Sequence, residues 1–274
     1  MTAARAFARK KPIIVYKAGR FPESAAAAAS HTGALASEDS IYDAVFQRAG
    51  IARVYDIGDI FNFTDLISRR NIPKGRKLAI VTNAGGPGVM ATDMLISKGG
   101  GLTLLSDDTM KKLDEVLPPF WSHGNPVDVI GDAPPERFAK ATEIVLKDDK
   151  VDAVLVILTP QAMTEPTKTA EAIAKISEHH SKPILAAWMG GKSMKEGIQV
   201  FLNKGISVYQ TPEQAIRAFM TLAHYSRNLD ILFETPKDIS VSFNLDRKKL
   251  RKEFTEKHFN KETILSEDVS KHLI

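Results

Sequence analysis

The sequence contains no cysteine, few aromatic residues and no long apolar run. Without cysteine, the 274-residue chain has no disulfide, no thiolate nucleophile and no cysteine-ligated metal site. No apolar run approaches the roughly 18 residues that a membrane-spanning helix needs, and the first residues form no signal-peptide pattern. We therefore expect a cytoplasmic protein that has no membrane partner.

The charge balance is only mildly basic, with a formal net charge of +4. Much of the excess lies late, in the run RKKLRK at 247–252. A nucleic-acid interface would more often interleave such a run with aromatic residues along one face. The run therefore favours a solvated helix face, and we expect no nucleic-acid partner.

Short apolar runs alternate with longer amphipathic segments along most of the chain. The runs are nearly continuous in hydrophobicity, which is typical of parallel strands that are covered on both faces. The predicted strands are 12–16, 78–82, 151–158 and 183–188, and the predicted helices are 38–49, 87–98, 109–116, 135–147, 165–179, 194–204 and 212–225. This alternation predicts an α/β fold with doubly wound parallel sheets.

Two candidate domain boundaries interrupt this alternation of strands and helices, one at 69–76 and one after Phe233. They divide the chain into residues 1–73, 74–232 and 233–274. The first part has a single obvious central strand, too few for a self-sufficient sheet, so we expect a partial domain. The second part predicts a complete α/β domain, and the polar third part predicts a linker followed by the start of another domain.

The glycine-rich turn Asn83-Ala84-Gly85-Gly86-Pro87-Gly88 follows one predicted strand and opens a helix. Free backbone N–H groups and the positive end of a helix favour a bound phosphate. The spacing matches neither the dinucleotide fingerprint nor the P-loop. A tight turn from strand to helix also needs glycine, so the turn by itself is compatible with a structural role.

His31 lies in the segment SAAAAASHTGALA at 24–36, among small residues that leave its ring accessible. A neutral imidazole has a free ring nitrogen that can act as a nucleophile. On this segment alone, a helix cap at Ser30 or Thr32 with an incidental histidine is the better explanation of the pattern. The remaining histidines show no metal-ligand spacing, and His123 is expected to support its loop rather than to react.

Three blocks in the chain resemble the NDP-forming acyl-CoA synthetases, relatives of succinyl-CoA synthetase. The first joins KPIIVYKAGR at 11–20 to SHTGALA at 30–36, and the second is VTNAGGPG at 81–88. The third comprises GNPVD at 124–128 and ILTPQAM at 157–163. Their order and spacing match this family across nearly the whole of 11–225.

The resemblance implies two flavodoxin-like domains, the first incomplete, and a phosphoryl relay. His31 would carry a phosphoryl group between an acyl phosphate and ADP or ATP. The overall reaction would convert an acid, CoA and ATP into acyl-CoA, ADP and phosphate. The phosphate-binding groups would come from two segments, namely Ser30, Thr32 and Gly33 beside the histidine and Gly85, Gly86 and Gly88 at the helix start.

The resemblance also implies partners and cofactors. ATP or ADP with Mg²⁺ and coenzyme A would serve the parent enzyme, with none bound tightly to this part alone. The CoA-binding domain would lie upstream and the ATP-grasp domain downstream, with 233–274 as linker and truncated start of the latter. We expect a small carboxylic acid as substrate and a homo-oligomeric assembly; the acyl group and the nucleotide base are left open.

Two other function classes compete with the enzyme. Related domains fused to protein acetyltransferases act as regulatory modules that have lost catalysis, and a flavodoxin-like domain can simply bind a ligand or a partner. The intact His31 favours the enzyme, because a regulatory module need not keep a nucleophile.

Overall fold

The computed structural model describes residues 2–25, 38–69 and 71–234, together with five positions in the C-terminal part (248, 249, 251, 252 and 255). Residues up to Glu234 form one compact unit, and residues from Thr235 belong to a second. The functional argument concerns the first unit. Ser30, His31, Thr32 and Gly33 lie outside the described residues.

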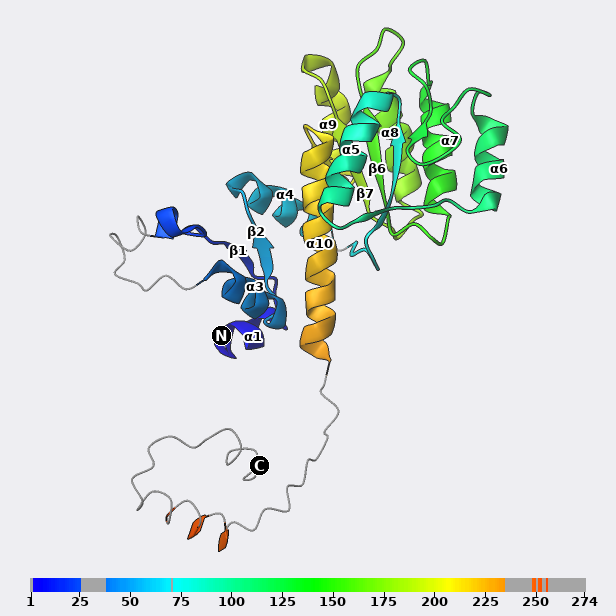
Figure 1. Ribbon diagram of the computed structural model, residues 1–274. Helices are drawn as coiled ribbons and strands as arrows, with labels where there is room; N and C mark the ends of the chain where they lie inside the picture. The colour runs from blue at the N-terminus through cyan, green and yellow to red at the C-terminus, as the bar shows by residue number, and fades with distance from the viewer. Residues whose placement is uncertain are drawn as a thin grey trace. The chain divides into compact units, whose positions relative to one another are not determined.

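The N-terminal part contributes a small parallel sheet with helices around it (Figure 1). Strand β1 pairs in parallel with β2, so that Ile14 lies opposite Ala52. Helix α4 begins after Asp56, whose carboxylate accepts a hydrogen bond from the Gly58 N–H at 2.6 Å and satisfies one of the free donors of the first turn. The elements are α1 (Thr2–Ala8), β1 (Ile14–Tyr16), α3 (Asp39–Arg48), β2 (Ala52–Val54) and α4 (Ile57–Ser68).

The rest of the unit is built on a six-stranded sheet in which every pairing is parallel. The strand order is β4-β3-β6-β7-β8, and β5 also pairs with β3. Its strands are β3 (Lys77–Thr82), β4 (Gly101–Leu102), β5 (Val127–Asp128), β6 (Ala153–Leu158), β7 (Ile184–Trp188) and β8 (Ser207–Tyr209). Its helices are α5 (Gly85–Ser97), α6 (Asp107–Val116), α7 (Pro135–Leu146), α8 (Pro166–Ser177), the 3-10 turn η1 (Lys192–Met194), α9 (Lys195–Asn203) and α10 (Pro212–Phe233).

Both faces of this sheet are buried. Alternate residues of each central strand point to opposite faces, and helices cover each face. In β3, Ala79 and Val81 join one apolar cluster, whereas Leu78 and Ile80 join the other. The first cluster includes side chains of α7, α8 and α9, and the second includes side chains of α5, α10 and α4. Helix α4 therefore attaches the N-terminal part to the core of the larger sheet.

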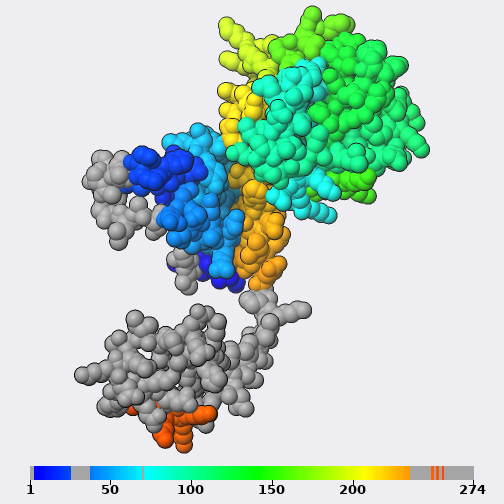
Figure 2. All heavy atoms as spheres, viewed as in Figure 1, coloured from blue at the N-terminus to red at the C-terminus, as the bar shows by residue number. Residues whose placement is uncertain are grey.

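The predicted α/β class with parallel sheets is confirmed, and every predicted strand and helix is present with small changes at its ends. The predicted elements did not include the short strands β2, β4, β5 and β8 or the helices α1 and α4. Strands of two or three residues carry too little periodicity to be recognised. Helix α10 extends to Phe233, beyond the predicted end at Tyr225, because its last turns pack on α3 and β2 (Figure 2).

Among the described residues, no helix combines the length and the apolar character that crossing a membrane requires.

Candidate functional site

The glycine-rich turn lies where the order of the large sheet reverses. From β3 the chain passes through α5 to β4 on one side, whereas β6 occupies the other side of β3. The loops after β3 and β6 therefore face each other at the carboxyl ends of the strands. In open α/β sheets this crevice is the usual place for a ligand.

The start of α5 presents backbone donors without a side-chain cap. Ala84 is the N-cap residue and makes no capping hydrogen bond through its side chain. The N–H groups of the first helical residues have no partner inside the helix, and Pro87 has no N–H at all. Gly85 and Gly86 are exposed, and a Cβ placed on Gly86 would meet no atom within 4 Å. The helix thus offers two accessible N–H groups and its positive end to an anion.

The side chain and backbone of Asn83 hold the Gly85–Gly88 turn in place. Its side chain is buried, with the carboxamide oxygen accepting from the Thr159 N–H at 2.9 Å and the amide donating to the Thr159 carbonyl at 2.9 Å. The Gln161 amide in turn donates to the Asn83 carbonyl at 2.9 Å. These bonds fasten the loop after β3 to the loop after β6, so the N–H groups at the start of α5 are preorganised.

Gly88 has a packing role that differs from that of Gly86. A Cβ on Gly88 would lie 3.3 Å from the Thr82 methyl group and 3.4 Å from Cβ of Pro126. The absence of a side chain therefore lets α5 approach the end of β3 and the neighbouring loop closely. Of the three predicted phosphate-binding glycines, Gly85 and Gly86 expose their backbone, whereas Gly88 is buried.

A third loop, which precedes β5, supports this end of the sheet. The Asn125 carboxamide accepts from the Ile80 N–H at 2.9 Å and donates to the Leu78 and Thr103 carbonyls at 3.0 Å each. It occupies the interval along β3 between the residues paired with β4 and those paired with β5. A single side chain therefore replaces a missing stretch of strand.

Asp128, at the end of β5, brings a carboxylate to the turn. Its Oδ2 lies 3.8 Å from the position that a Cβ on Gly85 would take, and its Oδ1 accepts from the Ile130 N–H at 2.9 Å. In the sequence, Asp128 stands out only as the last residue of the GNPVD motif, which indicates no role for its carboxylate. Its position at the carboxyl end of a strand was the one sequence signal that could have indicated a place near the site. No atom, including those of this carboxylate, lies within 4 Å of the position that a Cβ on Gly86 would take.

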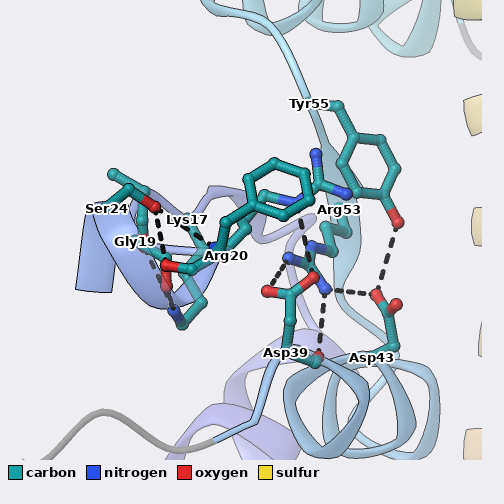
Figure 3. Close-up of polar contacts among 10 residues, drawn as sticks. Lys17, Gly19, Arg20, Ser24, Asp39, Asp43, Arg53 and Tyr55 are labelled. Carbon is teal, nitrogen blue, oxygen red and sulfur yellow. Dashed lines mark hydrogen bonds and ion pairs between the residues drawn. The ribbon is translucent and has the colours of Figure 1, made fainter. Parts of the chain in front are cut away.

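The segment that bears His31 is bounded on both sides by described residues that are tied together (Figure 3). The Arg53 guanidinium donates through Nη2 to Asp39 Oδ1 and through Nη1 to Asp43 Oδ1, each at 2.5 Å. Arg20 donates from Nε to Asp39 Oδ2 at 3.3 Å. Arg20 precedes residues 26–37 and Asp39 follows them, so one carboxylate links the two ends of the segment.

We call this network, formed by Arg53, Asp39, Asp43 and Arg20, the Arg53–Asp39 clamp. The Arg53 side chain is 6% exposed, and its hydrogen bond is the main reason that the pKa of Asp39 lies below its ordinary value. Tyr55 donates to Asp43 at 3.3 Å, and the Arg20 guanidinium lies 4.4 Å from the centre of the Tyr55 ring. Asp39 therefore remains ionised, and the clamp persists, at any pH near neutrality.

His123 supports its loop, as the sequence predicted. Its Nδ1 lies 3.0 Å from Asp114 Oδ1 and its Nε2 lies 2.9 Å from the Pro119 carbonyl. Trp121 also donates to Asp114, at 2.9 Å, and its ring contacts the imidazole with the two ring planes tilted by 45°. Within the part of the chain that the structure describes, no group of three or more His, Asp or Glu side chains could hold a metal ion.

Two protein-family models match this chain. A succinyl-CoA ligase-like flavodoxin domain matches residues 1–67, and a ligase-CoA domain matches residues 78–231. The second match covers more than half of the chain and contains the turn at Gly85–Gly88.

Named relatives and a solved structure agree with these matches. The chain is 37% identical over 247 residues to acetate–CoA ligase [ADP-forming] I of Archaeoglobus fulgidus, covering 90% of this chain and 35% of that protein. It is 38% identical over 232 residues to the α subunit of acetate–CoA ligase [ADP-forming] I of Pyrococcus furiosus, covering 83% and 49%. The dinucleotide-forming acetyl-coenzyme A synthetase 1 of Ca. Korarchaeum cryptofilum, solved with phosphate and ADP, superposes with a TM-score of 0.77 at 34% identity, covering 84% and 50%. The chain thus spans about a third to a half of the length of these relatives.

Proposed function

This chain belongs to the NDP-forming acyl-CoA synthetases, and we propose that it is the phosphohistidine-bearing part of an ADP-forming member, with His31 as the phosphoryl carrier. The overall reaction is an acid plus CoA plus ATP giving acyl-CoA, ADP and phosphate. The observation that carries the proposal is the start of α5, where the Gly85 and Gly86 N–H groups are exposed at the reversal point of the sheet.

The relay consists of three displacements at phosphorus and carbon. An imidazole nitrogen of His31 attacks the γ-phosphorus of ATP, and ADP leaves as the P–O bond breaks. A carboxylate oxygen of the acid then attacks the phosphohistidine, which gives an acyl phosphate and restores the imidazole. Finally the CoA thiolate attacks the acyl carbon, and phosphate leaves. We assign the amides at the start of α5 the task of stabilising the negative charge on the transferred phosphoryl group.

The Arg53–Asp39 clamp would fix the frame of the His31 segment without touching the reacting atoms. A phosphoryl carrier has to reach each partner in a productive geometry, and small misplacements are costly. Ser30, Thr32 and Gly33 are assigned phosphate contacts next to the histidine. These three residues lie outside the described positions, and their assignments are proposals.

The parent enzyme uses ATP or ADP and coenzyme A, in line with its family. Mg²⁺ would accompany the nucleotide; the described residues contain no cluster suited to hold the ion, so no step is assigned to it. We further propose that the CoA-binding and ATP-grasp domains come from the rest of the polypeptide or from a partner subunit, and that a small carboxylic acid is the substrate. A homo-oligomeric state and a cytoplasmic location stay predictions.

We also propose the division into residues 1–73, 74–232 and 233–274. The two family matches, which end at 67 and begin at 78, support the first boundary. The change of compact unit between Glu234 and Thr235 supports the second.

The test is phosphate labelling of the complete polypeptide with Mg-ATP, followed by mapping of the label. We expect an acid-labile, base-stable adduct on His31 that CoA and a carboxylic acid discharge together. His31→Asn should abolish the label and acyl-CoA synthesis with little change in thermal stability. His179→Asn, at an exposed position on another part of the unit, should keep both. A folded enzyme that carries no label would point to a regulatory module instead, and label or turnover in His31→Asn would refute the relay.

A further inference from the structure

A cleft of about 470 Å³ lies at the opposite end of the large sheet from the Gly85–Gly88 turn. Arg76 directly precedes β3 and Lys98 directly follows α5, and both line the cleft. Its other walls come from α3, β2 and α4 in the N-terminal part and from α10. The volume falls within the range of small-molecule sites.

Positive charge dominates the lining of this cleft. Its five cationic residues outnumber its two carboxylates, Asp43 and Asp59. Both carboxylates are already engaged, because Asp43 accepts from Arg53 at 2.5 Å and Asp59 accepts from Arg217 Nε at 3.0 Å. The three remaining cations are Arg76, Lys98 and Arg227. Among the residues that the structure describes, no carboxylate lies within ion-pair distance of these three.

Two of these cations, Arg76 and Arg227, lie near the same histidine. His224 of α10 lines the same cleft, and its pKa is lowered by burial and then by the positive charges of Arg76 and Arg227. Arg76 comes from the segment before β3, whereas Arg227 lies one turn after His224 on α10. Two guanidinium groups from different elements therefore act on one imidazole. Arg76, Lys98 and Arg227 are exposed, so solvent compensates their charges in the free protein. Positive charge gathered in a cleft raises the local concentration of anions.

We propose that this cleft binds a small anion that carries a diphosphate group, either as pyrophosphate or as part of a nucleoside diphosphate. Guanidinium groups match phosphate oxygens with two parallel hydrogen bonds, and Lys98 adds a flexible point charge. Three cations without a carboxylate partner suit a ligand of roughly three negative charges better than a single carboxylate. Apolar side chains, among them Phe46, Met220 and Ile231, leave room for a nucleoside beside the phosphates.

The experiment is a pH titration of the histidine imidazoles of the full chain by NMR, with and without added ligand. The probes are inorganic phosphate, pyrophosphate and ADP, and His224→Gln assigns the resonance. A bound anion stabilises the imidazolium form, so the pKa of His224 should rise by about one unit with pyrophosphate or ADP. Inorganic phosphate should act only at higher concentration.

Charge variants locate the site. Arg76→Gln and Arg227→Gln should each weaken binding about tenfold, because each removes a charge-assisted contact. Arg5→Gln, at an exposed position of α1 outside the cleft, should bind as the unchanged chain does. If Arg227→Gln fails to fold, Arg227→Lys takes its place, because this variant keeps the charge but loses the forked guanidinium.

The outcomes distinguish free pyrophosphate from the diphosphate group of a nucleoside diphosphate. Equal effects of pyrophosphate and ADP would assign the binding to the diphosphate group, and a stronger effect of ADP would add recognition of the nucleoside. A His224 pKa that responds to neither probe would overturn the proposal. A response that the Arg76 and Arg227 variants leave unchanged would overturn it as well. The readout does not depend on phosphorylation of His31, so this proposal and the relay can fail separately.

Discussion

Arg53 of β2 binds Asp39, the first residue of α3, through a hydrogen bond of 2.5 Å between Nη2 and Oδ1. Arg20 reaches the other oxygen of the same carboxylate at 3.3 Å. One side chain therefore connects the stretch after β1, the strand β2 and the start of α3. The residues between Arg20 and Asp39 include His31, so the clamp bounds the proposed phosphoryl carrier in the chain.

Arg53→Gln should slow phosphorylation of His31 in the complete enzyme by about tenfold or more, because the His31 segment loses one of its fixed ends. Arg53→Lys should recover part of the rate, since it keeps the charge but not the forked geometry. The rate of label incorporation from Mg-ATP measures the effect. Arg48→Gln, an exposed change on α3, is the matched control. A folded Arg53→Gln enzyme that labels at the normal rate would remove the clamp from the mechanism.

Gly86 and Gly88 should respond differently to the same substitution. Gly86→Ala meets open space, so stability should change by less than about 1 kcal/mol. Its new methyl group would occupy the proposed anion position, and labelling of His31 should slow by about tenfold. Gly88→Ala presses on Thr82 and Pro126 and should cost about 1–2 kcal/mol of stability. Thermal unfolding and labelling kinetics measured on both variants test the contrast; normal labelling in Gly86→Ala would argue against an anion at this helix start.

Asn125→Ala should destabilise the large sheet by about 1–3 kcal/mol, because the Ile80 N–H loses its acceptor inside the core. Urea-induced unfolding gives the free-energy difference. Asn203→Ala provides the comparison, since Asn203 is exposed and only accepts a bond from Gln199 within α9. Equal effects of the two substitutions would mean that the Asn125 carboxamide contributes nothing beyond an ordinary surface contact.

Asp148 should give the protein a specific acid sensitivity. Burial by itself would raise the pKa of this carboxyl, but backbone N–H groups of Ser106 and Lys150, at 2.7 and 2.9 Å, hold it below its ordinary value. A lowered pKa means that its contribution is fully present above pH ~4 and is lost as the pH falls through the native-state pKa.

Asp148→Asn should therefore cost about 1–3 kcal/mol at pH 7. The difference from the unchanged protein should narrow as the pH falls below ~4, because the carboxyl takes up a proton in the unfolded state first and in the native state only at lower pH. Unfolding free energies measured at several pH values give the curve. Asp149→Asn, at the exposed neighbouring position, should show neither effect. A difference that stays constant with pH would contradict the role of the charge.

Much of the architecture could be predicted from the sequence, because buried parallel strands and amphipathic helices leave long, regular patterns. The runs at 78–82 and 151–158 predicted β3 and β6, and their register places every residue of β6 in the core. The turn at Gly85–Gly88 was recognisable as a helix start with free N–H groups from its glycines and proline alone. The histidine in its alanine-rich segment was recognisable as a candidate nucleophile for the same local reason.

Other features depend on contacts between distant residues, which leave no periodic signal. No spacing in the sequence indicates that Asn83 fastens Thr159 and Gln161, or that Asn125 fills a gap along β3. The continuation of α10 to Phe233 likewise follows from its packing on α3 and β2.

The sequence by itself determined the fold class, a helix start within the Gly85–Gly88 turn and the identity of the chemical groups, because these depend on local periodicity and residue type. Only the tertiary structure decided which groups meet. It joined Arg53 to Asp39 across a chain separation of 14 residues and brought Arg76 to the same cleft as Arg227. The physical reason is that ion pairs and clefts form between elements whose relative positions are set by the packing of the whole core. The residue types of the individual side chains do not indicate those positions.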